Sequence, residues 1–167
     1  MTNSALSPHE ELAFECDGSL REIFIPHVDV PIWQRFIDHV RLHYPTEVRC
    51  GGSVATLPSA SELFAADDDP GWVLIIDLGG PVAHAFFFDP TGITVTLDPQ
   101  EIQTRIAVDR VLAFLGDVAR AVDARAFLTH ENAGRFETPP LGPTDVPSGT
   151  SYEYHPRRGL LRYPDDY

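Results

Sequence analysis

Apolar residues recur at helical spacing in two segments of the chain. In residues 29–44 the apolar positions are Trp33, Phe36, Ile37, Val40 and Tyr44. In residues 99–122 they are Val108, Val111, Leu112, Leu115, Val118, Ala119 and Val122. This spacing places one apolar stripe along each segment and predicts two amphipathic helices. Asp29 offers an N-cap to the first helix, and Asp98 followed by Pro99 is a typical start for the second.

Short apolar runs rich in β-forming residues predict strands in much of the remaining chain. The clearest run is Leu20–Pro26, and three more follow one another at 72–78, 82–88 and 93–97. Gly79-Gly80-Pro81 and Asp89–Gly92 separate these three runs. Such short connections exclude crossovers, so the three strands should form an antiparallel meander. Because the first two are nearly apolar on both faces, we expect them to be central and covered.

These elements predict an α+β fold. We expect a five- to six-stranded, mostly antiparallel sheet, with the helices at 29–44 and 99–122 on one of its faces. Residues 1–130 should form a single domain, in which residues 1–12 are polar and loose.

Residues 131–167 form a C-terminal tail of different composition. The tail holds six of the 15 prolines and four of the five tyrosines. Residues 131–150 are predicted to be an extended loop. Residues 152–155 and 160–163, around Pro156-Arg157-Arg158-Gly159, could form a final hairpin packed on the same domain.

The balance of acidic and basic residues argues against some classes of partner. The chain has 25 acidic and 12 basic residues, all of the latter arginine, and a formal net charge of −13. Because phosphate backbones are bound by clustered cations, this balance argues against a nucleic-acid partner. No apolar stretch is long enough to predict a membrane helix, and the two cysteines suggest no disulfide framework. We therefore expect a cytoplasmic protein that does not act at a membrane.

Candidate chemistry is sparse. His39 and His43 share one helix face, but zinc needs further ligands, so we predict no metal and no cofactor. His84 lies in phase with Phe86 and close to Asp77 across the turn, which is a conceivable acid–base pair. With Trp72 they would line a ligand pocket between the sheet and helix 29–44. No nucleophile accompanies them, so we predict no catalytic residue.

A protein-binding role fits the composition better. The excess of acid would attract a basic protein partner, and Asp67, Asp68 and Asp69 lie together before the meander. Tyrosine and arginine are enriched at interface hot spots. The candidate contact residues of the tail are Tyr152, Tyr154, Arg157, Arg158 and Tyr163. The alternatives are a homo-oligomeric structural or regulatory module, and a small-ligand-binding protein or enzyme that uses the sheet–helix pocket.

Three segments carry a resemblance to known proteins: Cys16–Ile23, Trp33–Phe36 and Phe127–Asn132. Together they resemble small acidic bacterial α+β proteins of immunity-type or unknown function. The resemblance spans residues 14–132 and concerns size, acidity and element order. It implies an inhibitor that neutralises a toxin, and it assigns no functional residues.

Overall fold

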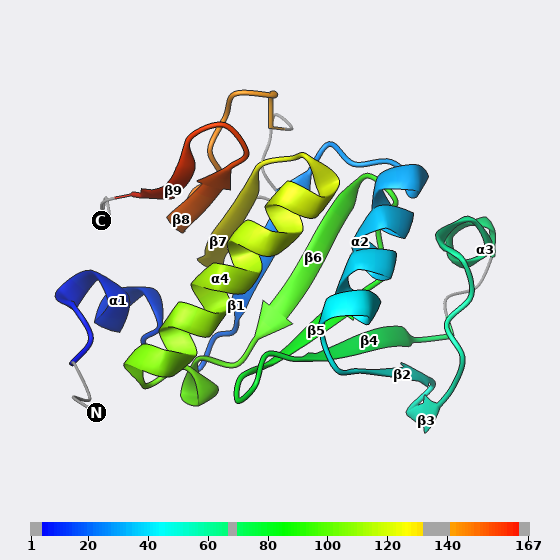
Figure 1. Ribbon diagram of the computed structural model, residues 1–167, viewed down its shortest axis with the longest axis horizontal. Helices are drawn as coiled ribbons and strands as arrows, with labels where there is room; N and C mark the ends of the chain where they lie inside the picture. Colours follow the sequence, from blue (N-terminus) through cyan, green and yellow to red (C-terminus); the bar gives the residue numbers. More distant parts are fainter. Residues whose placement is uncertain (1–4, 67–69, 132–140, 164–167) are drawn as a thin grey trace.

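A computed structural model (Figure 1) shows one antiparallel sheet with two long helices lying across it. It describes residues 5–66, 70–131 and 141–163. The strands are β1 (Arg21–Pro26), β2 (Thr46–Cys50), β3 (Ser53–Val54), β4 (Trp72–Asp77), β5 (Val82–Phe86), β6 (Gly92–Leu97), β7 (Ala126–His130), β8 (Thr150–His155) and β9 (Gly159–Arg162). The helices are α1 (Pro8–Ala13), α2 (Val30–His43), α3 (Ala60–Ala65), the 3-10 turn η1 (Pro99–Glu101) and α4 (Arg105–Val122).

The sheet is larger than its hydrophobic pattern predicts. Within the described chain its order is β3-β2-β4-β5-β6-β1-β7-β8-β9, and each neighbouring pair is antiparallel. The α+β class is confirmed, whereas the prediction of five to six strands is too low. The hairpins β2–β3 and β8–β9 extend the two ends of the sheet by backbone hydrogen bonds. A side-chain pattern can suggest such a hairpin, as it does for residues 152–155 and 160–163, but it does not reveal which edge of the sheet the hairpin extends.

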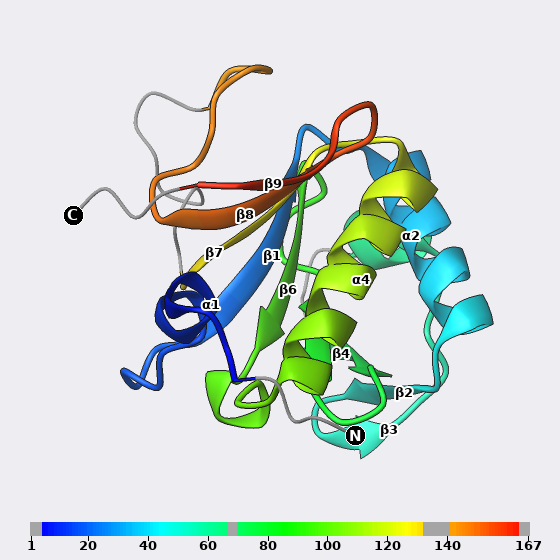
Figure 2. The ribbon, with the colours of Figure 1, turned by 60° about the vertical axis from the view of Figure 1, so that its left-hand side comes forward.

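Helices α2 and α4 pack together on one face of the sheet (Figure 2), as expected. Asp29 caps α2 by accepting the backbone N–H of Ile32 at 2.9 Å. Beneath the helices lies the core, in which the indole N–H of Trp33 donates to the carbonyl of Asp89 at 3.0 Å. The face covered by α2 and α4 is called the helix side below.

The second predicted helix is interrupted near its start. Asp98 and Pro99 begin only the turn η1, and Thr104 then caps α4 by accepting the N–H of Ala107 at 3.2 Å. The side chain of Gln103 lies between the two helical pieces and donates to the carbonyl of Pro99 at 2.8 Å. A second N-cap residue therefore restarts the helix six residues after the first.

The prediction that residues 1–12 are loose is wrong for the first helix. Ser7 and Glu10 form a reciprocal capping box at the start of α1. The buried carboxylate of Glu10 also pairs with Arg105 of α4 at 2.6 Å, which holds α1 against the domain. In the part of the chain that the structure describes, no helix combines the length and apolarity needed to cross a bilayer.

Candidate functional site

The two faces of strands β4 and β5 have different surroundings. Leu74, Ile76, Ala83 and Ala85 are fully buried on the helix side. The alternate residues, which point to the other face, are only partly buried: Val73, Ile75, Val82, His84 and Phe86. No described helix packs on that face, although we expected both faces to be covered. The central strands therefore present apolar side chains toward solvent.

Two further apolar side chains extend this surface. Phe88 is 57% exposed and stacks on Phe86, with ring centroids 5.3 Å apart. Val54 is 73% exposed and lies opposite Arg49, which in turn lies opposite Val73. Residues paired across antiparallel strands share a face. We call this surface the open face: its partly or fully exposed side chains on β3–β5 and just after β5 are Val54, Val73, Ile75, Val82, His84, Phe86 and Phe88, and the ion pair of Arg49 and Glu47 lies on the same face, opposite Val73 and Ile75.

Acidic side chains gather where strands β4, β5 and β6 meet their turns. Asp77 ends β4 and accepts the N–H of Gly79 at 2.7 Å. Glu101 accepts the N–H of Val82 at 2.7 Å, and Asp98 accepts that of Gln100 at 2.8 Å. In the described segments none of these three carboxylates has a basic side chain within ion-pair distance. One end of the open face therefore carries three carboxylates without ion pairs, and one guanidinium, that of Arg110, lies nearby at the Gly79-Gly80 turn.

The predicted sheet–helix pocket does not form from its three residues. Asp77 pairs with Val82, and His84 pairs with Ile75, so Asp77 and His84 are neighbours on the open face. Trp72 has the phase of Leu74 and packs against the core on the helix side. Strand alternation therefore separates Trp72 from Asp77 and His84, and neither Asp77 nor His84 lies beneath α2.

The tail residues occupy several environments. Tyr152 is fully buried, with its ring 4.8 Å from that of His9, so its side chain is not on the surface predicted for a partner. Tyr154 lies against α4, where a Cβ on Gly116 would stand 2.8 Å from its ring. Arg157 and Arg158 are exposed in the turn between β8 and β9. Asp67, Asp68 and Asp69 lie outside the described residues.

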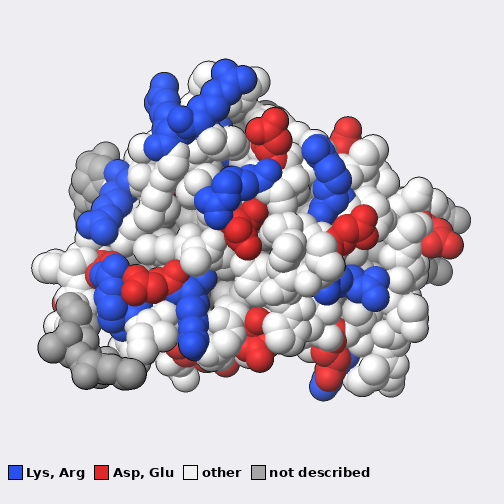
Figure 3. Space-filling view, viewed as in Figure 1, with Lys and Arg blue, Asp and Glu red and all other residues white. Residues whose placement is uncertain are grey.

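Charges on the helix side are largely paired. Figure 3 shows arginine and acidic side chains beside one another there. Arg105 bridges to Asp109 at 2.8 Å, and Arg120 to Asp117 at 3.0 Å. The hydroxyl of Tyr44 also donates to Asp117 at 2.8 Å. Burial raises the pKa of Asp117, but the hydrogen bonds from Tyr44 and Arg120 outweigh it and hold the pKa below its ordinary value.

A groove of about 440 Å³ runs along this paired network, between α4 and strand β9. Tyr154 and Leu160 contribute apolar surface to it, and Arg162 contributes a guanidinium. The nearby rings of His39 and His43 are 4.5 Å apart, and His39 approaches Asp117 at 3.5 Å. Over the described ranges, no group of three His, Cys, Asp or Glu side chains is placed to hold a metal ion.

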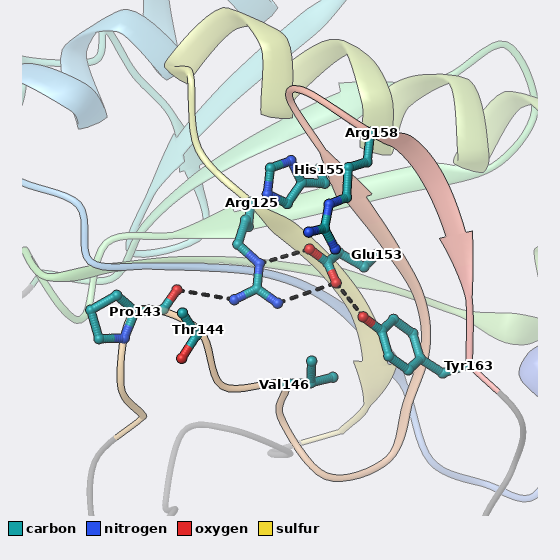
Figure 4. Close-up of a pocket in the computed structure, with 8 residues that line it drawn as sticks. All are labelled: Arg125, Pro143, Thr144, Val146, Glu153, His155, Arg158 and Tyr163. Atoms are coloured by element: carbon teal, nitrogen blue, oxygen red, sulfur yellow. Dashed lines mark hydrogen bonds and ion pairs between the residues drawn. The ribbon is translucent and has the colours of Figure 1, made fainter.

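A second cavity lies beside the hairpin, on the opposite side of the sheet from α4 (Figure 4). Its volume is about 260 Å³. Arg125 donates to the buried carboxylate of Glu153 at 2.7 and 3.2 Å, and the Tyr163 hydroxyl donates to it at 2.5 Å. Burial raises the pKa of Glu153. The hydrogen bonds from Arg125 and Tyr163 lower it by more than burial raises it, so the pKa lies below its ordinary value.

Sequence reasoning missed the open face, although its signal is in the sequence. Strands that are apolar on both faces predict that both faces of the sheet are covered. The sequence pattern does not say whether a helix of the same chain or another molecule covers each face. Comparison with protein-family models, with curated proteins and with solved structures finds no match to this chain.

Proposed function

We propose that the protein is a non-enzymatic binding protein that recognises a basic protein partner through its open face. The observation that carries this proposal is the set of partly exposed apolar side chains on β4 and β5. Contiguous exposed apolar surface is uncommon on monomeric proteins and is typical of interaction sites. Phe86 and Phe88 supply aromatic area of the kind that dominates interface energetics.

Charge supports a basic partner rather than a neutral one. Asp77, Asp98 and Glu101 border one end of the open face and form no ion pair among the described residues, although the guanidinium of Arg110 lies over the Gly79-Gly80 turn beside Asp77. The whole chain carries a formal charge of −13. Such a field speeds the encounter with a cationic protein, and carboxylates at the rim orient it. An immunity-type inhibitor, which the resemblance suggests for this chain, would be an acidic binding protein of this kind.

Two pairs of variants with matched exposure test this proposal. Phe88→Glu and Val54→Glu place a charge on the open face, at side chains 57% and 73% exposed. Ile106→Glu and Leu42→Glu place the same charge on α4 and α2, at side chains 58% and 78% exposed. Each immobilised protein is incubated with cell extract at about 0.15 M salt, and the retained proteins are quantified by mass spectrometry.

We expect the wild type and both helix variants to retain the same basic protein. The open-face variants should retain about tenfold less, or even less than that, because docking would have to strip water from a new carboxylate at an apolar contact. The purified partner should then bind more weakly as salt increases. Equal retention by all five proteins would contradict the proposal. A dimer in sedimentation that Phe88→Glu dissociates would instead assign the open face to a second copy of this chain.

A further inference from the structure

The cavity beside the C-terminal hairpin contains an ion pair whose hydrogen bonds are already used. Arg125 directs Nε and Nη2 to Glu153, and its Nη1 donates to the carbonyls of Pro143 and Asp145 at 3.1 and 3.0 Å. Both oxygens of Glu153 are occupied, one by Arg125 alone and the other by Arg125 and Tyr163. The Arg125–Glu153 pair therefore carries no net charge, and each carboxylate oxygen already accepts at least one hydrogen bond.

Two cationic or donor side chains remain for a ligand. Arg158 lines the cavity, and within the described chain its guanidinium makes neither an ion pair nor a hydrogen bond. His155 accepts the backbone N–H of Arg157 at Nδ1, at 3.1 Å. The neutral ring must then carry its hydrogen on Nε2, which leaves that atom as a donor. Figure 4 shows both side chains beside the Arg125–Glu153 pair.

Two further polar residues lie at or beside the wall of this cavity, and neither adds an unengaged carboxylate to it. Thr144 also lines the cavity and is an exposed residue, so its hydroxyl can rotate toward a bound ligand. The carboxylate of Asp145 turns back on its own loop, where it accepts the N–H of Gly142 at 2.7 Å. The cavity therefore offers a guanidinium, an imidazole N–H and a hydroxyl, whereas the acids nearby are engaged.

We propose that this cavity binds a phosphate group carried by a small molecule. Arg158 would supply the charge and a two-pronged contact to the phosphate oxygens, while His155 and Thr144 would donate to the others. A volume of about 260 Å³ accommodates the phosphate and part of the group that bears it. The site lies at β7–β9, away from the open face on β4 and β5, so it does not depend on the function proposed above.

Inorganic phosphate is the probe for this site. It is titrated into the full-length protein at constant ionic strength, while the ring signals of His155 are followed by NMR and the heat by calorimetry. The variant Arg158→Ala removes the unpaired guanidinium. The matched control is Arg157→Ala, which removes the same charge from the adjacent exposed position without lining the cavity. Its backbone N–H, which contacts His155, is retained.

We expect saturable binding by the wild type that shifts the His155 signals. Arg158→Ala should weaken this binding by about tenfold or more, and Arg157→Ala should change it by less than about twofold. His155→Gln should also weaken it. The absence of saturable shifts, or an equal loss in the two arginine variants, would overturn the site. Saturation by acetate but not by phosphate would overturn the choice of ligand.

Discussion

Replacing Arg21 with alanine should lower the free energy of unfolding by about 3–4 kcal/mol. This side chain is only 1% exposed. Its guanidinium donates to the carbonyls of Ala13 and Glu15 at 2.7 and 2.8 Å, and to the hydroxyl of Ser19 at 2.7 Å. The substitution removes these charge-assisted hydrogen bonds and leaves the acceptors to find water. Urea unfolding followed by circular dichroism measures the loss.

Besides this global loss, local opening should increase most in the region of the chain that Arg21 contacts. Hydrogen exchange of Arg21→Ala should increase in α1 and in residues 13–20, because Arg21 joins that segment to the sheet. Arg49→Ala is the comparison, since its pairing with Glu47 is solvent-exposed and should contribute less than about 1 kcal/mol. A loss below about 1 kcal/mol for Arg21→Ala would show that water replaces the guanidinium at little cost.

Hydrophobic periodicity predicts the helices because the residues that recur at helical spacing form the one face that each helix buries against the sheet. The apolar stripe over 29–44 becomes α2, and Asp29 caps it as expected. In contrast, α1 is only six residues long, and its position depends on the distant contact between Glu10 and Arg105. The capping residues Ser7 and Glu10 were the available local signal. A pairing that spans 95 positions cannot be inferred from local spacing.

One part of the candidate site, the closeness of Asp77 and His84, could be predicted because it depends only on local sequence. The turn at Gly79-Gly80 brings Asp77 and His84 to adjacent pairs on one face, as the short connection implies. Trp72, however, is five positions before Asp77 on the same strand, so strand alternation alone places the two side chains on opposite faces and separates Trp72 from the acid–base pair. The cavity beside the hairpin was still less accessible. It requires Arg125, which precedes β7, to meet Glu153 on β8, and that meeting depends on how the tail joins the sheet.

Neutralising Glu153 should have a large effect that depends on pH. Glu153→Gln keeps the shape of the side chain but removes the charge that holds Arg125 and Tyr163. Near neutral pH we expect it to lower the free energy of unfolding by about 2–3 kcal/mol. The carboxylate is 1% exposed, so water screens the interaction little. Urea unfolding at several pH values measures the difference from the wild type.

The direction of the pH dependence follows from the lowered pKa of Glu153. In the unfolded chain this carboxyl titrates near its ordinary value of 4.5, whereas in the folded protein it stays ionised to lower pH. The unfolded state therefore binds more protons in this window, and stability rises with pH across it. The stabilisation should be complete above about pH 4.5 and disappear as the pH falls through the folded pKa.

The difference between wild type and Glu153→Gln should accordingly shrink on acidification. When Glu153 is protonated, the wild-type side chain is as neutral as glutamine. Glu11→Gln serves as the control, because Glu11 is exposed on α1 and makes no ion pair within the described residues. It should follow the wild-type curve at every pH. A difference between wild type and Glu153→Gln that stays constant from neutral to acidic pH would show that the loss does not come from the charge of Glu153, but from the amide group of glutamine, whose NH₂ cannot accept from Arg125 or Tyr163.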